Sequence, residues 1–450
     1  MMNEPPSFRK PRHRQAIASV LMSLALILVE SGPASASLRN PLAYNSPNLS
    51  PATLTVWLSG SVSTQPTFVA VAKAFEKLHP GIKIKWITEP SNASAYFSLV
   101  HTSNIAHNGP DIEFLWTGYY VEQNTPWLVK LNSVIPLATQ RNLFEPQYSS
   151  ANYNTQDGMY LAPTYTQFYI GIYDTTLFAK AGIKSPPQDW SQLYSDCGKL
   201  KAIGVTPIEY GNDIGLSSGF YVAFDLGYLL AGVLSPAQWD GLYTGKVPWN
   251  EPAIVSQVAR WARLYKMGCT NSNALTETNP LPPIANGKAA MYINGDWNAT
   301  TGTFPESVVK HLGVFTPPYN VSPMHNLVIM SGAGFAATSY GSHIADSLAF
   351  LKFLETDQGQ SNFTTDFDPE LKRIPAKYVK TDTQDKTLLD WASSGKYRLY
   401  PFIDNVTQPA VYSTAQKVLP AAFVGQMSAK AAMDDIEQTE RSLPASERQL

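Results

Sequence analysis

The chain has 450 residues and a formal net charge of −2, with 44% hydrophobic and 15% charged residues. A chain of this length is expected to form two or three domains or one large two-lobed body. Its hydrophobic content supports a sizeable core and excludes wholesale disorder. Because 33 basic and 35 acidic residues nearly balance, no broad electropositive surface is available and nucleic acid is not expected as a partner.

The first 36 residues have the pattern of a secretory signal peptide. Four basic residues within 9–14 precede an apolar stretch over 16–29, and Ala34-Ser35-Ala36 has the form of a cleavage site. The apolar stretch is shorter than the roughly 20 residues that cross a bilayer as a helix, so an uncleaved anchor is the weaker alternative. Residues 37–52, which include several Pro, Asn and Ser, are expected to form a flexible leader. No cysteine lies near the cleavage site, so we expect an exported protein, periplasmic or extracellular, without a lipid anchor.

Strand and helix patterns alternate along the rest of the chain. Residues 54–58 form an apolar run typical of a strand, and apolar residues at helical spacing predict a helix over 68–78. Residues 82–86 alternate between apolar residues and lysine, which completes a strand-helix-strand unit whose strands should be parallel. The alternation predicts an α/β architecture. Further strands are expected at 111–115 and 170–173, and further helices at 254–265, 348–354 and 429–436.

Ligands in open α/β sheets lie beyond the carboxyl ends of the strands. This rule directs attention to three segments of the chain. They are residues 59–63, residues 116–120 and the region around Tyr165 and Gln167.

Motifs for metal, nucleophilic or phosphate-binding chemistry are missing from the sequence, so no metal and no cofactor are expected. Residues 331–337 (SGAGFAA) fit a loose dinucleotide-binding pattern, but a glycine pair that permits close backbone approach at a crossing strand is the preferred interpretation. Asp111 and Glu113 share one face of a predicted strand, which keeps a secreted hydrolase with two carboxylates as an alternative.

Cys197 and Cys269 are the two cysteines of the chain. In an oxidising compartment they can form a disulfide. Two buried free thiols are an equally good interpretation, because the sequence does not show whether the two residues approach each other.

Two segments resemble extracellular solute-binding proteins of the maltose-binding type, the receptors of carbohydrate ABC importers. Residues 286–297 (NGKAAMYINGDW) resemble the GKAAM-x-x-x-G-x-W signature of that family. Residues 158–190 resemble its G-x-x-y-x-x-P, Y-N-x-x-x-F-x-x-a-G and P-P-x-T-W run. The motifs occur in the family's order, and the similarity covers most of residues 53–440.

The resemblance implies a two-lobed periplasmic-binding-protein-like α/β fold, in which each lobe is a sheet flanked by helices and the ligand cleft lies between the lobes. It places the N-terminal lobe at 53–165 plus 331–380 and the C-terminal lobe at 166–330 plus 381–450. The chain is then expected to cross between the lobes near residues 164–168, 328–332 and 376–388.

The resemblance also implies where the ligand binds. Trp297 matches a tryptophan that stacks on sugar, and the C–H face of a pyranose packs well on an aromatic ring. Trp116 lies one position after a second such tryptophan, and Gln167 has the spacing of a hydroxyl-binding glutamate. A structural role is the alternative for each of these residues. The expected ligand-binding set is Trp297, Trp116, Gln167, Asp296, Asn212, Asp213, Tyr165, Tyr119, Ser59 and Ser61.

The sequence therefore predicts a monomeric, non-enzymatic receptor that captures a sugar or oligosaccharide and delivers it to the permease subunits of an ABC transporter. The alternatives are a secreted carbohydrate-active hydrolase and a receptor of the same fold for a non-sugar solute. An oxyanion receptor needs arginines that the cleft segments lack, and Tyr119-Tyr120 is not accompanied by the carboxylate and histidine that ferric receptors use. The family's late aromatic platform aligns with Val411, beside Tyr412, which argues against maltodextrin as the sugar.

Overall fold

The structure is a computed structural model that describes residues 51–59, 66–89, 93–135, 154–155, 158–211, 220–299, 303–362, 383–445 and 448. The described residues all belong to one compact unit. The predicted signal peptide and most of the predicted leader lie outside the described residues. Among the helices that the structure describes, none has the length and apolarity needed to cross a membrane.

The chain begins with the predicted strand-helix-strand unit, which is confirmed. Strand β1 (Ala52–Ser59) leads into helix α2 (Pro66–Leu78), and strand β2 (Ile82–Glu89) lies parallel to β1. The helix buries Phe68, Val71, Ala72 and Phe75, four of the five residues whose spacing predicted it, whereas the fifth, Leu78 at its end, is 48% exposed. Helix α3 (Ala93–Ala106) and the fully buried strand β3 (Ile112–Leu115) follow, and β3 pairs parallel with β1.

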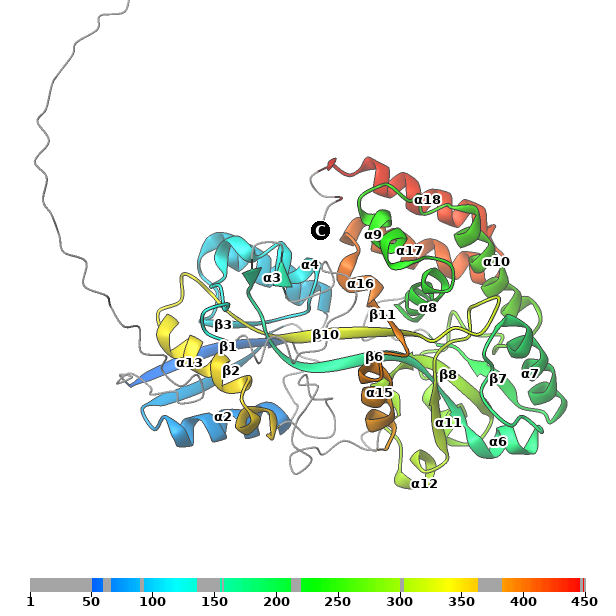
Figure 1. Cartoon of the computed structure of the whole chain (residues 1–450), viewed down its shortest axis with the longest axis horizontal. Helices are drawn as coiled ribbons and strands as arrows, with labels where there is room; N and C mark the ends of the chain where they lie inside the picture. Colours follow the sequence, from blue (N-terminus) through cyan, green and yellow to red (C-terminus); the bar gives the residue numbers. More distant parts are fainter. Residues whose placement is uncertain are drawn as a thin grey trace, which may run out of the picture. The chain divides into compact units, whose positions relative to one another are not determined.

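One mixed sheet of nine strands organises the unit, in the order β2-β1-β3-β10-β6-β8-β7. Its central strands are β6 (Ala162–Asp174) and β10 (Asn326–Ala337), which lie side by side and antiparallel (Figure 1). Sheets with helices packed on them confirm the predicted α/β class. The remaining strands of the sheet are β7 (Thr206–Glu209), β8 (Ala289–Gly295), β9 (Leu312–Phe315), which pairs with β6, and β11 (Arg398–Pro401), which pairs with β10.

The glycine-containing segment 331–337 lies inside β10. This strand pairs with β3 on one side and with β6 on the other, with shifts of register on either side of Ala333. A dinucleotide fingerprint needs a turn from a strand into a helix, and β10 continues as a strand instead. Two of the predicted crossings, 164–168 and 328–332, fall within β6 and β10. The third falls mostly outside the described residues and ends in helix α15 (Thr383–Ser393).

The three predicted helices are confirmed as α10 (Pro252–Lys266), α13 (Ile344–Leu354) and α18 (Ala429–Ser442). Helix α13 packs on β10, β1 and α2, whereas α10 and α18 pack with α17. A separate hairpin pairs β4 (Asn154–Thr155) with β5 (Gly158–Met159). The other helical elements are α4 (Tyr119–Glu122), η1 (Thr125–Trp127), α6 (Thr175–Lys180), α7 (Trp190–Ala202), α8 (Phe220–Ala231), α9 (Pro236–Tyr243), α11 (Leu281–Ala285), η3 (Asp296–Asn298), α12 (Glu306–Val309), α14 (Asp357–Gln360), α16 (Ile403–Val406) and α17 (Pro409–Phe423).

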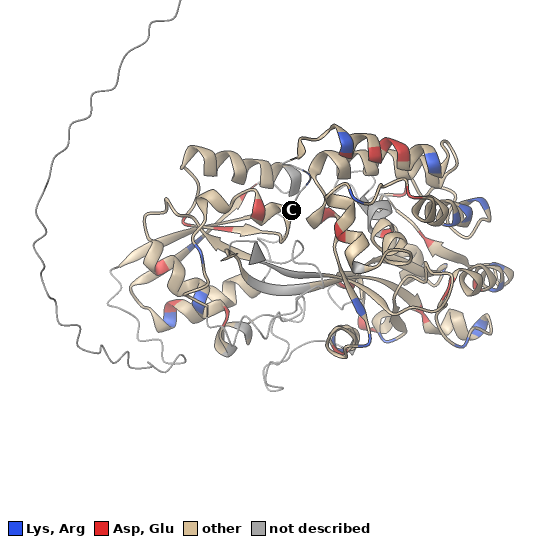
Figure 2. Cartoon of the chain, turned by 45° about the horizontal axis from the view of Figure 1, so that its top comes forward, with Lys and Arg blue, Asp and Glu red and all other residues tan. Residues whose placement is uncertain are grey.

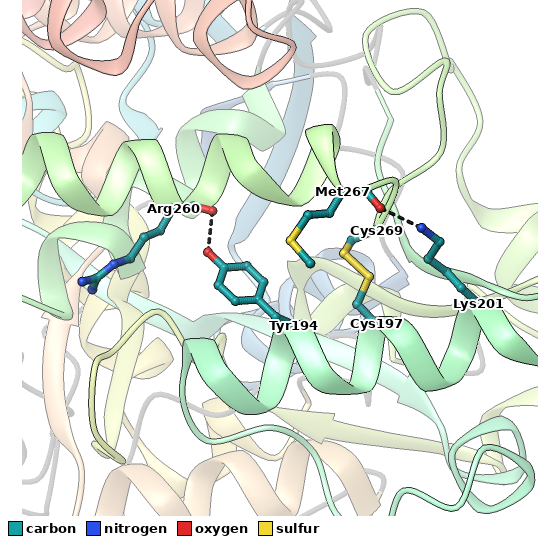
Figure 3. Close-up of a disulfide and its surroundings, with 6 residues drawn as sticks. All are labelled: Tyr194, Cys197, Lys201, Arg260, Met267 and Cys269. Atoms are coloured by element: carbon teal, nitrogen blue, oxygen red, sulfur yellow. Dashed lines mark hydrogen bonds between the residues drawn. A yellow bond between two sulfur atoms is a disulfide. The ribbon is translucent and has the colours of Figure 1, made fainter.

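Cys197 and Cys269 form a disulfide, which settles the alternative that the sequence left open. Both residues are buried, and the bond joins α7 to the chain that follows α10 (Figure 3). Two hydrogen bonds reinforce the same contact. The hydroxyl of Tyr194 donates to the carbonyl of Arg260 at 2.9 Å, and Lys201 Nζ donates to the carbonyl of Met267 at 2.7 Å.

Positively and negatively charged residues are interspersed along the described helices (Figure 2). Lys199 pairs with Asp196 at 2.7 Å and Lys430 with Asp434 at 2.6 Å, each within one helix. Asp196 is buried and Lys199 is exposed, whereas both partners of the second pair are exposed, and an exposed pair contributes at most about 1 kcal/mol to folding. The fold is therefore held mainly by its apolar core.

Candidate functional site

The indole of Trp297 lies directly against the backbone of Gly295. Gly295 ends β8 and pairs with Tyr169 of β6, and the chain then turns into η3. A Cβ atom added to Gly295 would overlap the six-membered ring of Trp297, so only glycine allows this position of the ring. Trp297 is half-buried, and its ring and that of Tyr169 make an edge-to-face contact with centroids 6.0 Å apart.

Asp296 fixes this turn to the central strand. One carboxylate oxygen accepts a hydrogen bond from the backbone N–H of Phe168 at 3.0 Å, and the other accepts from the N–H of Trp297 at 2.9 Å. Gln167, next to Phe168 on β6, is half-buried. The structure thus brings Asp296 and Trp297 against the part of β6 that carries Gln167. Asp296 is buried, with 5% of its surface exposed, and binding of a sugar hydroxyl by its carboxylate stays a prediction.

Trp116 and Tyr119 belong to a second group, at the carboxyl end of β3. Trp116 is half-buried and packs against Phe97 of α3, with centroids 4.9 Å apart, and against Tyr120 of α4 at 5.4 Å. Tyr119 begins α4 and is also half-buried. Both side chains keep part of their surface accessible, as a sugar-stacking role requires.

Helix α16 connects the two groups. The hydroxyl of Tyr169 donates to Asp404 Oδ1 at 3.1 Å, and Asn405 Nδ2 donates to Thr117 Oγ1 at 3.0 Å. The ring of Tyr169 also stacks on Phe402 just before this helix. We refer to Thr117, Tyr169, Asp404 and Asn405 as the α16 junction.

Sequence reasoning missed the α16 junction. The one local signal is the Asp404-Asn405 pair within the otherwise apolar run 399–406 (LYPFIDNV). Both polar residues are buried, with 4% and 1% of their surface exposed. Buried polar side chains in such a run indicate a specific contact, although the sequence does not say with which partner.

The electrostatics of the junction follow from burial. Loss of hydration raises the pKa of Asp404 to about 7, partly offset by the hydrogen bond from Tyr169. Burial likewise raises the pKa values of the Tyr120 and Tyr412 hydroxyls, and the charge of Asp404 raises them further. Near neutral pH the Asp404 carboxyl is therefore poised between its protonated and its charged form.

The other predicted binding residues fall into two classes. Ser59 is buried at the end of β1, and Tyr165 lies in β6 opposite Ala333, with a side chain outside the described set. Ser61, Asn212 and Asp213 lie outside the described residues. Their binding roles remain predictions.

The carboxylates of the hydrolase alternative are each engaged by neighbouring side chains. Asp111 accepts hydrogen bonds from the N–H and the hydroxyl of Thr55, at 2.9 and 2.7 Å. Glu113 is fully buried and accepts from Asn104 at 3.0 Å, and burial raises its pKa to about 8. These contacts give both carboxylates a structural role within the fold.

A polar cavity of about 330 Å³ adjoins Asp111. It lies at the amino ends of β1 and β3, away from the edge where Ser59 and Trp116 follow the same strands. None of the predicted binding residues lines this cavity. Its walls include Thr53, Thr55, His107, Tyr340 and His343. Over the described ranges, His, Cys, Asp and Glu side chains do not gather in any group of three suited to a metal ion.

The chain is similar to known solute-binding proteins. The family model for bacterial extracellular solute-binding proteins matches residues 60–361. An uncharacterized ABC transporter extracellular-binding protein of Pyrococcus horikoshii is 24% identical over 365 residues, which is 77% of each chain. A chitin oligosaccharide binding protein has a similar structure, with a TM-score of 0.71, 20% identity and coverage of 86% of this chain and 98% of the other. Maltose-bound MalE3 of T. maritima gives a TM-score of 0.67 at 18% identity, covering 87% of this chain and 99% of the other.

Proposed function

The chain belongs to the bacterial extracellular solute-binding proteins, and from this premise we propose that it captures a sugar or oligosaccharide and delivers it to the permease subunits of an ABC transporter. In this proposal the protein binds its ligand without transforming it and acts as a monomer. Structural neighbours named for chitin oligosaccharide and for maltose support a sugar as the ligand.

The position of Trp297 carries the proposal. Its ring is supported on one side by the backbone of Gly295 and is only half-buried, so part of the indole remains available for stacking. Asp296 precedes Trp297 in the chain, and Gln167 precedes Phe168, whose backbone N–H donates to Asp296, so the segments beside this turn carry a carboxylate and an amide for sugar hydroxyls. A flat apolar face beside neutral and acidic hydrogen-bonding groups suits a pyranose ring.

The proposed receptor has its lobes at the boundaries predicted above, 53–165 plus 331–380 and 166–330 plus 381–450. Sugar bound between the lobes contacts both of them only in the closed form, so binding increases the population of that form. The permease would then distinguish the closed receptor from the open one.

Titration of tryptophan fluorescence with maltotriose, diacetylchitobiose, xylobiose and galactose tests the proposal. We expect saturable quenching by at least one of these sugars and its loss in Trp297→Ala. Trp391→Ala is the matched control. Trp391 lies in α15 and is also half-buried, but its ring stacks on Tyr397 in the segment that follows this helix. Equal loss of quenching in both variants would argue against Trp297 as the sugar platform.

Product analysis separates the receptor from the hydrolase alternative. After incubation with the same oligosaccharides, we expect them to be recovered intact by chromatography. Release of shorter sugars with turnover would reject the receptor proposal.

We further propose that the mature protein is exported without a lipid anchor. Fractionation of the native host tests this location. Recovery in the membrane fraction after high-salt washing would contradict it.

A further inference from the structure

We propose that Asp404 is a positioning residue for solute binding, whose neutral carboxyl group completes the α16 junction when the lobes close, so that the protein takes up a proton as it binds sugar. The inference rests on the proposed function. It assigns a specific role to a residue that does not itself contact the sugar.

The α16 junction joins parts of the chain that belong to different predicted lobes. Thr117 lies in the predicted N-terminal lobe and Asn405 in the predicted C-terminal lobe, 288 positions apart in the sequence. Each has only 1% of its surface exposed, so their hydrogen bond is shielded from water. A contact of this kind between two moving lobes must break when they separate.

Asp404 also controls the position of the sugar platform. Its carboxylate oxygen accepts a hydrogen bond from the hydroxyl of Tyr169, whose ring contacts the indole of Trp297 and stacks on Phe402. The carboxyl group therefore acts on Trp297 through Tyr169. A change at Asp404 reaches the indole through one intervening side chain.

The groups that face Asp404 are uncharged phenols. Tyr169 comes from β6, Tyr120 from α4 and Tyr412 from α17. The backbone N–H groups of Asp404 and Asn405 supply further hydrogen bonds. Helix α8 also packs on α16, but its Asp225 is held by the hydroxyls of Tyr210 and Tyr319. Within this described set no cation balances a charge on Asp404.

Burial without a cation favours the protonated acid, and this fixes the direction of the pH effect. In this structure the pKa of Asp404 is about 7, and in the proposal this is the closed junction, whereas separation from Tyr120 and α4 would admit water and lower the pKa toward the ordinary value of 3.8. Between these two values the closed form binds a proton that the open form lacks. Sugar affinity should therefore fall by up to about tenfold per pH unit as the pH rises through this range, and level off above about pH 7.5.

The test is calorimetric titration with the tightest-binding member of the sugar panel at pH 5.0, 6.0, 7.0 and 8.0. Titrations at pH 6.0 in two buffers of different ionisation enthalpy count the protons taken up. We expect uptake of up to one proton per sugar by the wild type. Asp404→Asn keeps an acceptor for Tyr169 but cannot titrate, so it should bind with nearly the same affinity at every pH.

Asp225→Asn is the matched control. Asp225 is also a fully buried carboxyl whose pKa is raised to about 7, but its partners Tyr210, Tyr319 and Trp261 all lie in the predicted C-terminal lobe. Asp404 differs because Tyr120 of α4, in the predicted N-terminal lobe, faces it in addition to Tyr169 and Tyr412 of its own lobe. The Asp225 carboxyl stays buried whether the lobes are open or closed, so the variant should keep the wild-type pH profile. A purely structural carboxyl would behave in this way.

The outcomes separate the two proposals. Sugar binding with a flat pH profile, or an Asp404→Asn variant that retains the wild-type slope, would overturn the inference and leave the receptor function standing. Failure of every sugar at every pH would overturn the proposed function and the inference with it. If Asp404→Asn does not fold, the wild-type proton count still decides, and Thr117→Val, which removes the acceptor for Asn405, should weaken binding at all pH values.

Discussion

Gly295 and Trp297 act as one unit at the scale of single residues. The glycine is required by the indole that lies over its Cα atom, and not by an unusual backbone conformation, because its φ of −134° is accessible to any residue. The glycine and the tryptophan of the family signature are therefore needed together, because the indole can take this position only over a glycine. The ring needs a flat backbone surface beneath it if its other face is to meet a sugar.

Gly295→Ala should displace the indole of Trp297. The added methyl group overlaps the ring, so we expect a loss of about 1–3 kcal/mol in the free energy of unfolding and weaker sugar quenching. Urea denaturation and the fluorescence titration measure the two effects. Gly198→Ala in α7 is the control, because its Cβ meets no atom within 4 Å and alanine favours a helix. Unchanged sugar binding in Gly295→Ala would show that the ring position does not matter.

Glu113 gives the stability of the protein a second pH dependence. Its pKa is about 8 in the folded state against 4.5 for an unperturbed glutamate, so the folded state binds the extra proton between these values. Stability should fall by about 1.4 kcal/mol per pH unit over this range through this group.

Glu113→Gln should therefore gain stability relative to the wild type between pH 5.0 and pH 8.5, measured by urea denaturation. The amide can still accept the hydrogen bond from Asn104 but does not titrate. Glu306→Gln, at an exposed position in α12, should show no such gain. Equal pH profiles for Glu113→Gln and the wild type would contradict the buried-acid explanation.

At the scale of elements, the disulfide fastens α7 to the end of α10. Two hydrogen bonds from α7, made by Tyr194 and Lys201, join the same two segments. The covalent bond closes a loop that spans a sequence separation of 72. Neither cysteine contributes to the α16 junction or to the turn at Trp297.

Replacing both cysteines by serine should lower stability without lowering sugar affinity. A loop of this length corresponds to about 4 kcal/mol of unfolded-state entropy, and measured losses are typically about 2–4 kcal/mol. Thermal unfolding with and without reductant provides the measurement, since the wild type under reduction should approach the variant. A variant that binds sugar more weakly would show that this part of the fold reaches the site.

Elements with a regular apolar pattern could be predicted from the sequence, and contacts between distant segments could not. The spacing of Phe68, Val71 and Phe75 is a property of one helix, so the sequence contains it completely. The contact between Thr117 and Asn405 depends on how the whole chain folds. The GKAAM segment located Trp297 because the family preserves a local signature, whereas Asp404 lies in a short run without one.

At the scale of the whole molecule, strands β6 and β10 join the predicted lobes through one continuous sheet. Backbone pairing extends along both strands, from Val328 with Tyr169 to Phe335 with Ala162. Paired strands bend and twist together, which restricts the motion to a limited closure. The α16 junction then defines the closed end of that motion.

Small-angle X-ray scattering should show a smaller radius of gyration when a saturating sugar is added. Closure brings the proposed lobes together, so the change should require binding and be absent from Trp297→Ala. An unchanged radius in the presence of a sugar that calorimetry shows to bind would contradict lobe closure.

The place of β10 between β3 and β6 also has a consequence during synthesis. β3 ends at residue 115 and the residues of β10 that pair with it are 334–337, so the ribosome must add about 220 residues before this pairing becomes possible. At roughly 5–20 residues per second, that interval lasts about 10–40 s. During this interval β3 lacks its neighbour on one side, so the early strands cannot complete their native fold. Such a delay suits a polypeptide that is threaded through a translocation channel before it folds.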